Sequence, residues 1–151
     1  MLVKDILASK GSVVVTTSPS DTIETLCKLL REKRKGAAIV SDGHGVIEGV
    51  ITERDITYGL AAHGAKISAM LVSELMTKTV ITCKPGDSVA ILGSTMLSRG
   101  IRHIPVAVDG RAVGMVSIRD VLNLRVVDLQ QVAAQLRTSV IEADRPLQDR
   151  E

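Results

Sequence analysis

A strand-to-helix corner that occurs twice constrains this chain more than any other feature of its sequence. Residues 49–56 read Gly-Val-Ile-Thr-Glu-Arg-Asp-Ile, and residues 114–121 read Gly-Met-Val-Ser-Ile-Arg-Asp-Val. In each copy a short apolar run, rich in β-branched residues, leads to a hydroxyl residue and then to a helical pattern. Each copy is therefore predicted to be a buried strand that ends at the N-terminus of a helix.

The corner belongs to a longer internal repeat. Residues 15–23 match 81–89 around a Pro-x-Asp-[Thr/Ser] motif, and residues 2–7 match 71–76. A repeat of this length is the sequence signature of one structural unit used twice. The predicted organisation is a first unit over 1–64, a second unit over 65–126, a C-terminal amphipathic helix over 127–141 and a polar tail over 142–151.

The corner has a structural and a functional interpretation. In the structural interpretation the corner is a capping box. The hydroxyl of Thr52 or Ser117 accepts from a backbone N–H of the first turn, and the carboxylate of Asp55 or Asp120 accepts in return from the backbone N–H of that hydroxyl residue. The same geometry suits a nucleotide, because a helix N-terminus attracts phosphate and a carboxylate accepts from a ribose diol. The neighbouring arginine adds a planar fork for phosphate oxygens. Duplication of the corner favours the nucleotide interpretation.

Composition excludes several classes of partner. Aromatic residues make up 1% of the chain, so it lacks the stacking platforms of single-stranded nucleic-acid binders. A net charge of +2 is too small for the electrostatic footprint of a nucleic-acid-binding protein. No apolar run reaches membrane-spanning length, and the N-terminus does not read as a signal peptide. No nucleic-acid or membrane partner is therefore expected.

The two cysteines suggest a reducing compartment. Cys27 and Cys83 are far apart and form no CxxC pair, so no disulfide is expected and the cytoplasm is the predicted location. Cys27 falls inside a helical pattern and is expected to be a small buried hydrophobic residue.

The Pro-x-Asp-[Thr/Ser] helix start and the Gly-h-h-[Thr/Ser]-x-x-Asp corner, where h is hydrophobic, support a family assignment. On these motifs each copy resembles a CBS motif, the unit named after cystathionine β-synthase, and the tandem pair resembles a Bateman module over residues 2–126. The resemblance implies an α+β fold in which two pseudo-symmetric β-α-β-β-α units pack through their sheets.

The expected elements follow the same order in both units. In the first unit they are a strand at 13–16, a helix capped at Asp21 and running to Arg34, strands at 37–40 and 46–51 around a hairpin turn at 42–45, and a helix from Arg54 to Ala62. In the second unit they are a strand at 80–82, a helix at 87–99, and strands at 104–108 and 112–116 around the turn Asp109-Gly110. The expected hairpin pairs are Val40/Val46 and Val108/Ala112.

The resemblance also implies two ligand clefts between the copies, each combining the corner of one copy with residues of the other. The first is expected to contain Thr52, Arg54, Asp55, Thr77, Lys78, Val80, Ile101, Arg102 and His103. The second is expected to contain Ser117, Arg119, Asp120, Gly11, Ser12, Val13, Lys35, Gly36 and Ala37. Arg102 and His103 add phosphate partners, so the first cleft is predicted to bind more tightly.

The function implied is regulatory. The expected ligand is an adenine nucleotide or adenosyl compound: AMP, ADP, ATP, NAD(H) or S-adenosylmethionine. No catalysis is expected, because His44, His63 and His103 share no spacing and no metal-ligand cluster or phosphate-loop signature is present. The alternative is an interaction module whose clefts are empty or degenerate. In either case the regulated target protein is not visible in the sequence.

Two further patterns remain open at this stage. The basic run Arg31–Lys35 is interpreted as the solvated last turn of a helix, where cations suit the negative helix end. Beyond the second corner an a/d pattern at 3.5-residue spacing continues through Leu122, Val126, Leu129, Ala133, Leu136 and Val140. This stripe either packs back on its own unit or joins a second copy, and the homodimer is the favoured interpretation.

Overall fold

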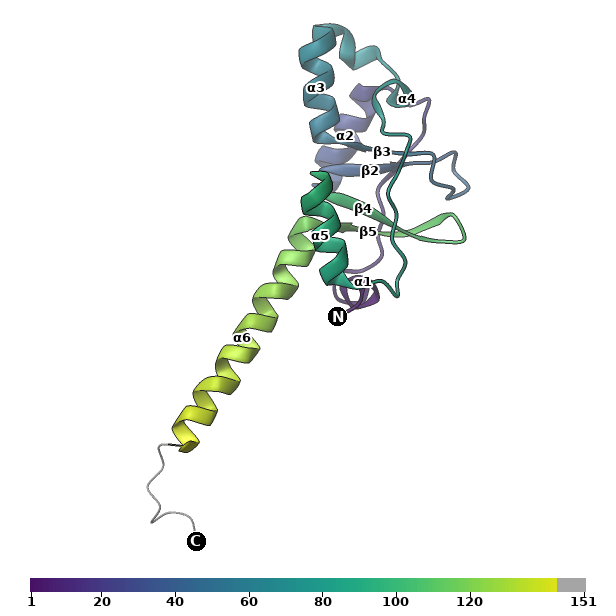
Figure 1. Ribbon diagram of the computed structural model, residues 1–151. Helices are drawn as coiled ribbons and strands as arrows, with labels where there is room; N and C mark the ends of the chain where they lie inside the picture. Colours follow the sequence, from purple (N-terminus) through teal and green to yellow (C-terminus); the bar gives the residue numbers. More distant parts are fainter. Residues whose placement is uncertain (144–151) are drawn as a thin grey trace.

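The computed structural model describes residues 1–143 and has two small sheets at its centre with helices around them (Figure 1). The first copy supplies α1 (Val3–Lys10), β1 (Thr16–Thr17), α2 (Ile23–Lys33), β2 (Ala37–Val40), β3 (Gly49–Thr52), α3 (Glu53–His63) and a 3₁₀ helix, η1 (Gly64–Ala69). The second supplies α4 (Val72–Leu75), α5 (Val89–Arg99), β4 (His103–Val108), β5 (Arg111–Ser117) and α6 (Ile118–Ala143). The predicted α+β class is confirmed.

The two sheets are built around equivalent hairpins. In the first sheet β1 is parallel to β2, and β2 is antiparallel to β3. In the second, β4 and β5 are antiparallel with a register shift after Val106. The predicted turn Asp109-Gly110 joins them, and φ values of 50° and 74° at its two residues are those of a type I′ turn.

The hairpin register differs from the prediction. Val40 pairs with Gly49 rather than Val46, and Val108 pairs with Arg111 rather than Ala112. The first difference arises because residues 44–47 of the loop before β3 hydrogen-bond to the other hairpin, and Glu48 is the residue of the loop that bonds back to Val40 of β2. The bonds to the other hairpin are Arg111 Nη1 to His44 O at 2.6 Å, Ala112 N to Gly45 O at 3.0 Å and Ile47 N to Gly110 O at 3.4 Å. The predicted return strand 46–51 therefore begins only at Gly49.

The strands predicted at 13–16 and 80–82 are also wrong in extent. Val13 is 83% exposed, and β1 is confined to Thr16 and Thr17. Residues 80–82 form no strand, and Cys83 alone makes a parallel bridge to Val106.

Each hydrophobic core takes a helix from the other copy. In α1, Val3 and Ile6 are buried in the core that α5, β4, β5 and the start of α6 form. Reciprocally, Val72 of α4 is buried in the core of α2, β2 and β3. The two sequence copies are therefore interlocked rather than separate.

The Pro-x-Asp motifs anchor these exchanged helices. In the second copy's motif, Pro85 O accepts from Lys4 N at 2.8 Å and Asp87 O accepts from Val3 N at 2.9 Å. The equivalent bonds in the first copy run from Ser73 N to Pro19 O at 3.1 Å and from Val72 N to Asp21 O at 2.8 Å. The repeated motif thus joins each copy to the other through backbone hydrogen bonds.

The repeated glycine of the corner has a packing role. A Cβ on Gly49 would lie 2.7 Å from Met76 Sδ and 2.9 Å from Thr77 O. A Cβ on Gly114 would lie 2.6 Å from Leu7 Cδ2. In both copies the absent side chain makes room for a segment of the other copy.

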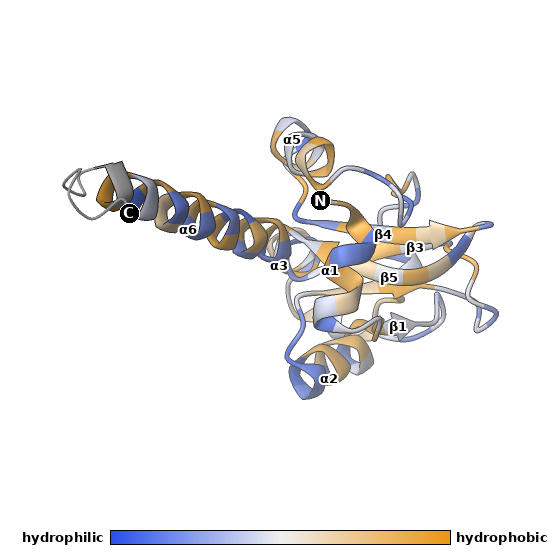
Figure 2. Cartoon of the chain, turned by 90° about the horizontal axis from the view of Figure 1, so that it is seen from below, coloured by the Kyte–Doolittle hydropathy of each residue, from blue (hydrophilic) through white to orange (hydrophobic). Residues whose placement is uncertain are grey.

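The helix α6 begins at the second corner and then leaves the body of the molecule. It is one continuous helix from Ile118 rather than a separate element starting at residue 127. Only its first turns pack inward: Val121 is buried and Leu124 is partly buried against the second core. Farther along, apolar and polar residues alternate on a rod that projects from the sheets (Figures 1 and 2). Residues 144–151 of the predicted tail lie outside the described residues.

None of the helices described for residues 1–143 is both long and apolar enough to cross a membrane.

Candidate functional site

Both corners are capping boxes. In the second, Asp120 Oδ2 accepts from Ser117 N at 2.7 Å and from Ser117 Oγ at 2.8 Å. In the first, Asp55 Oδ2 accepts from Thr52 N at 2.8 Å and from Thr52 Oγ1 at 2.9 Å. In each case the hydrogen bonds converge on Oδ2. Across residues 1–143 no donor reaches Oδ1 of either carboxylate, so this second oxygen remains able to accept from a ligand hydroxyl.

The larger of two clefts lies at the second corner. Its volume is about 870 Å³, and it is bounded by the ends of α1 and α2, the start of α3, β5 and the first turn of α6. Of the residues predicted for this cleft, all except Ser12 line it. Further lining residues are Lys10, Val15, Cys27, Leu30, Arg31, Arg34, Glu53, Ile56, Thr57, Arg102, His103, Met115 and Ile118.

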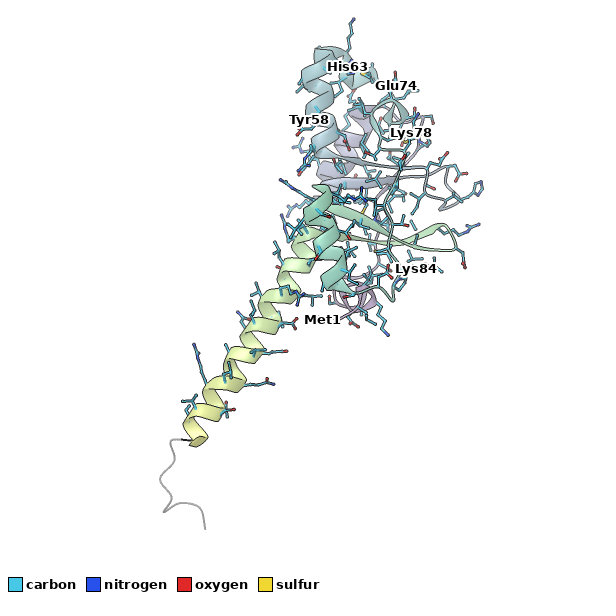
Figure 3. The ribbon with its side chains drawn as sticks, viewed as in Figure 1. Met1, Tyr58, His63, Glu74, Lys78 and Lys84 are labelled. Atoms are coloured by element: carbon cyan, nitrogen blue, oxygen red, sulfur yellow. The ribbon has the colours of Figure 1, made fainter. Side chains whose placement is uncertain are left out.

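The smaller cleft lies at the first corner and has a volume of about 190 Å³. Of the residues predicted for it, all except Lys78 line it, and Lys78 lies on the exposed segment after α4 (Figure 3). Further lining residues are Val50, Glu53, Thr79, Ile81, Gly100 and Pro105. Arg54 Nη1 donates to Gly100 O at 2.9 Å and so joins the corner of one copy to the other copy.

The volumes favour the second cleft as the ligand site. Sites for small organic ligands generally enclose about 300–1,000 Å³. The cleft at Asp120 falls within this range and the cleft at Asp55 falls below it. From Arg102 and His103, the cleft at Asp55 was expected to bind ligand more tightly. The cleft volumes favour the cleft at Asp120 instead.

Those two residues do not belong to one cleft alone. Glu53, Arg102 and His103 line both clefts and form a wall between them. Burial lowers the pKa of His103 below its usual 6.5, against the opposing effect of the Glu53 and Asp120 carboxylates. At neutral pH the imidazole is therefore uncharged.

The Asp120 carboxylate is ionised. Burial acts to raise its pKa, but the hydrogen bond from Lys10 and the two from Ser117 outweigh burial and hold the pKa below its usual 3.8. The Lys10 ammonium lies 2.7 Å from Asp120 Oδ2. A group that stays charged within a cleft is suited to binding a polar ligand group.

The predicted burial of Cys27 is wrong. Cys27 is exposed and lines the larger cleft, whereas Cys83 is buried at 4% exposure. The face of α2 that enters the core carries Ile23, Leu26 and Leu30, and Cys27 follows that stripe by one residue. Burial, together with the nearby Asp87, raises the pKa of Cys83 to about 11, so its thiol stays protonated.

The basic run at the end of α2 lies beside the larger cleft, a location that its sequence pattern did not indicate. All five residues of 31–35 are exposed, as a solvated last turn requires, but Arg31, Arg34 and Lys35 line the larger cleft. Their closeness in sequence to Gly36 and Ala37, which were predicted for this cleft, was the available signal. Among residues 1–143, no three His, Cys, Asp or Glu side chains gather closely enough to hold a metal ion.

A tandem α+β repeat with two inter-copy clefts defines a class of ligand-binding regulatory modules. The CBS domain family model matches residues 3–62 and 72–126, so this chain belongs to the CBS domain family. The Bacillus subtilis CBS domain-containing protein YhcV is 30% identical over 118 residues, which cover 78% of this chain and 81% of YhcV. Other relatives are longer: the chain spans 57% of MK0525 from Methanopyrus kandleri and 25% of CBSCBSPB2 from Arabidopsis thaliana.

Solved structures agree with the fold. The CBS-domain protein ATU1752 from Agrobacterium tumefaciens superimposes with a TM-score of 0.80 at 38% identity, over 83% of this chain and 99% of that one. The CBS domain pair of MJ0100 was solved with 5′-methylthioadenosine and S-adenosylmethionine; its TM-score is 0.75 at 29% identity, over 85% and 98% of the two chains. PAE2072 from Pyrobaculum aerophilum was solved with AMP; its TM-score is 0.70 at 25% identity, over 80% and 89%.

Proposed function

We propose that this protein is a regulatory sensor that binds an adenine nucleotide or related adenosyl compound in the cleft at Asp120. The observation that carries the proposal is the Asp120 carboxylate itself. It is held ionised in a cleft of about 870 Å³, and one of its oxygens has no donor among residues 1–143. The adenosyl ligands of the related MJ0100 and PAE2072 support this ligand class.

Different groups of lining residues suit the ribose, the adenine and the phosphate of such a ligand. Asp120 Oδ1 would accept from the ribose hydroxyls. Aliphatic side chains would enclose the adenine, because a flat, weakly polar base gains by displacing water from apolar surface. The first turn of α6 and the arginine beside Asp120 would face phosphate. The apolar lining consists of Val13, Val15, Leu30, Ile56, Met115 and Ile118.

A thermal-shift panel tests this function against the alternative of an interaction module with empty clefts. Adenosine, AMP, GMP and S-adenosylmethionine would each be added in large excess to the full chain. A ligand that binds only the folded state raises the melting temperature. We expect stabilisation by adenine compounds and not by GMP. No shift with any adenine compound would favour the interaction module.

The protein is proposed to act by binding rather than by catalysis, on a target protein that it regulates. The family model that matches the chain is that of the CBS domain, and proteins of this family are generally regulatory rather than catalytic. Its two cysteines are free thiols, which fits the proposed location in a reducing cytoplasm.

We further propose a homodimer joined through α6. Along this helix Leu129 and Leu136 are 68% and 62% exposed, and the helix does not pack its stripe back onto its own unit. An a/d stripe on a projecting helix is self-complementary, because two copies related by a two-fold axis present the same knobs and holes to each other. A second copy of this chain is therefore the partner that the pattern fits.

A further inference from the structure

We infer that the cleft at Asp120 is built for an adenosine di- or triphosphate in preference to a monophosphate or a cationic adenosyl compound. This inference rests on the proposed function and narrows its ligand class. It starts from the basic run at the end of α2, whose position beside the cleft was not expected from its pattern.

Charge is concentrated in this cleft far beyond that of the chain as a whole. Six cationic side chains line it against two carboxylates, Glu53 and Asp120, whereas the net charge of the entire sequence is only +2. The smaller cleft is balanced, with Arg54 and Arg102 against Glu53 and Asp55. The six cations are Lys10, Arg31, Arg34, Lys35, Arg102 and Arg119.

Five of these six cations have no carboxylate partner among residues 1–143. In this part of the chain, only Lys10 of the six has a carboxylate within 4.0 Å. Like charges gathered around one cavity repel one another, and a bound polyanion relieves that repulsion. Arginine side chains are also suited to bidentate hydrogen bonds with phosphate oxygens.

The helix end alone does not explain the arrangement. Cations near a helix C-terminus offset its negative end, and both Arg31 and Lys33 lie in the last turn of α2. Lys33, however, is paired with Glu32 at 2.9 Å and does not line the cleft. Arg31 and Lys35 do line it and have no such partner among the described residues. In this run, therefore, one cation is paired with a carboxylate and lies away from the cleft. The other three line the cleft: Arg31, Arg34 and Lys35.

The excess of positive charge also argues against S-adenosylmethionine. Its sulfonium and ammonium groups are cationic and only its carboxylate is anionic, so the net positive charge of the molecule would meet like charge in this cleft. A triphosphate would meet opposite charge from several elements at once, including the end of α2, the residue before β4 and the first turn of α6.

The test is calorimetric titration of the full chain with AMP, ADP, ATP and S-adenosylmethionine in magnesium-free buffer. We expect ATP to bind about tenfold or more tightly than AMP, the gain from one added charge-assisted contact. The double variant Arg31→Gln with Lys35→Gln should remove most of that difference, so that the ratio of ATP affinity to AMP affinity falls to within about threefold of one. Its matched control is Lys33→Gln, which should leave the ATP-to-AMP ratio unchanged.

The outcomes separate this inference from the proposed function. If AMP binds and ATP binds no more tightly, the polyphosphate preference is overturned while the adenosine site stands. An equal loss in Lys33→Gln would also overturn it, because general surface charge would then be responsible. If none of the four compounds binds, both proposals fall. A second measurement is the salt dependence: raising ionic strength should weaken ATP binding more than AMP binding.

Discussion

Lys10 Nζ lies 2.7 Å from Asp120 Oδ2, although the two residues are 110 positions apart in sequence. The pair joins α1 of the first copy to the first turn of α6 in the second, inside the larger cleft. It links the interlocked fold to the proposed site, because the lysine reaches the carboxylate only when α1 is docked on the second core.

Removing the lysine should change the acid stability of the protein. The pKa of Asp120 is lower when folded than its usual 3.8, so its contribution to stability is present above about pH 3.8 and is lost as pH falls through the folded pKa. Lys10→Met should raise the pKa of Asp120 in the folded protein and so reduce the stability that is lost as pH falls. Because Lys10 is 31% exposed, the effect at pH 7 should not exceed about 1 kcal/mol.

Urea unfolding of wild type and Lys10→Met at pH 7 and at pH 3 would measure this difference. A similar substitution at Lys28, whose partner Glu24 is exposed, serves as the control. Identical pH profiles for wild type and Lys10→Met would show that the ion pair does not set the ionisation of Asp120.

His103 should make nucleotide affinity depend on pH. Burial lowers its pKa below 6.5 in the free protein, with Glu53, Asp120, Lys10 and Arg102 as the charged groups around it. A bound phosphate would raise that pKa, so affinity should increase as pH falls below about 6.5. The unliganded protein should lose stability over the same range, because the unfolded chain binds the proton more readily.

AMP would be titrated into wild type and into His103→Gln between pH 7.5 and 5.5, and the change in affinity with pH would be compared between the two proteins. The variant removes the imidazole but keeps a polar side chain, and it exposes the opposing effect of phosphate protonation, whose second pKa is about 6. Parallel profiles for the two proteins would place His103 outside the range of the phosphate.

The two corner glycines should differ in their tolerance of alanine. At Gly49 the new Cβ would meet the backbone oxygen of Thr77 at 2.9 Å as well as Met76 Sδ, and a backbone atom in a paired segment cannot move easily. At Gly114 the atoms met belong to the end of the Leu7 side chain. Gly49→Ala should therefore cost about 1–3 kcal/mol of unfolding free energy, and Gly114→Ala less. Urea denaturation gives both values, and the opposite order would refute the explanation of the repeated glycine.

The proposed dimer predicts a clear response to charge on α6. Wild-type protein at tens of micromolar should sediment as a dimer, and Leu129→Asp with Leu136→Asp should shift it to monomer by burying unpaired charge. Gln131→Asp with Thr138→Asp adds the same charge on the opposite helix face and should leave the dimer intact. A wild-type monomer, or a dimer that responds equally to both pairs, would remove α6 from the interface.

Local features were readable from the sequence and long-range ones were not. The capping boxes at Thr52 and Ser117 and the turn at Asp109-Gly110 depend on residues close in sequence, and all were predicted. The start of β3 at Gly49 could not be predicted in this way, because residues 44–47 hydrogen-bond to a hairpin that lies far along the chain.

The site was predicted in the same uneven way. The corners and the residues before β2 and β4 follow from the family resemblance, and nearly all of them line the clefts. Lys10 enters the larger cleft because α1 is exchanged between copies, and Arg31 because α2 ends at its rim. Cleft volume depends on how side chains such as Arg54 pack between copies, so the order of the two clefts could not be read from charge in the sequence.

The most direct test of the account is calorimetric titration of AMP into wild type, Asp120→Ala and Asp55→Ala. Both substitutions remove the carboxylate of a capping box, so each is the structural control for the other. We predict that Asp120→Ala weakens binding by about 10- to 150-fold, the equivalent of about 1.5–3 kcal/mol for a hydrogen bond to a charged group. Asp55→Ala should leave the affinity within about threefold of wild type. Unchanged binding in Asp120→Ala together with its loss in Asp55→Ala would contradict the assignment of the ligand to the larger cleft.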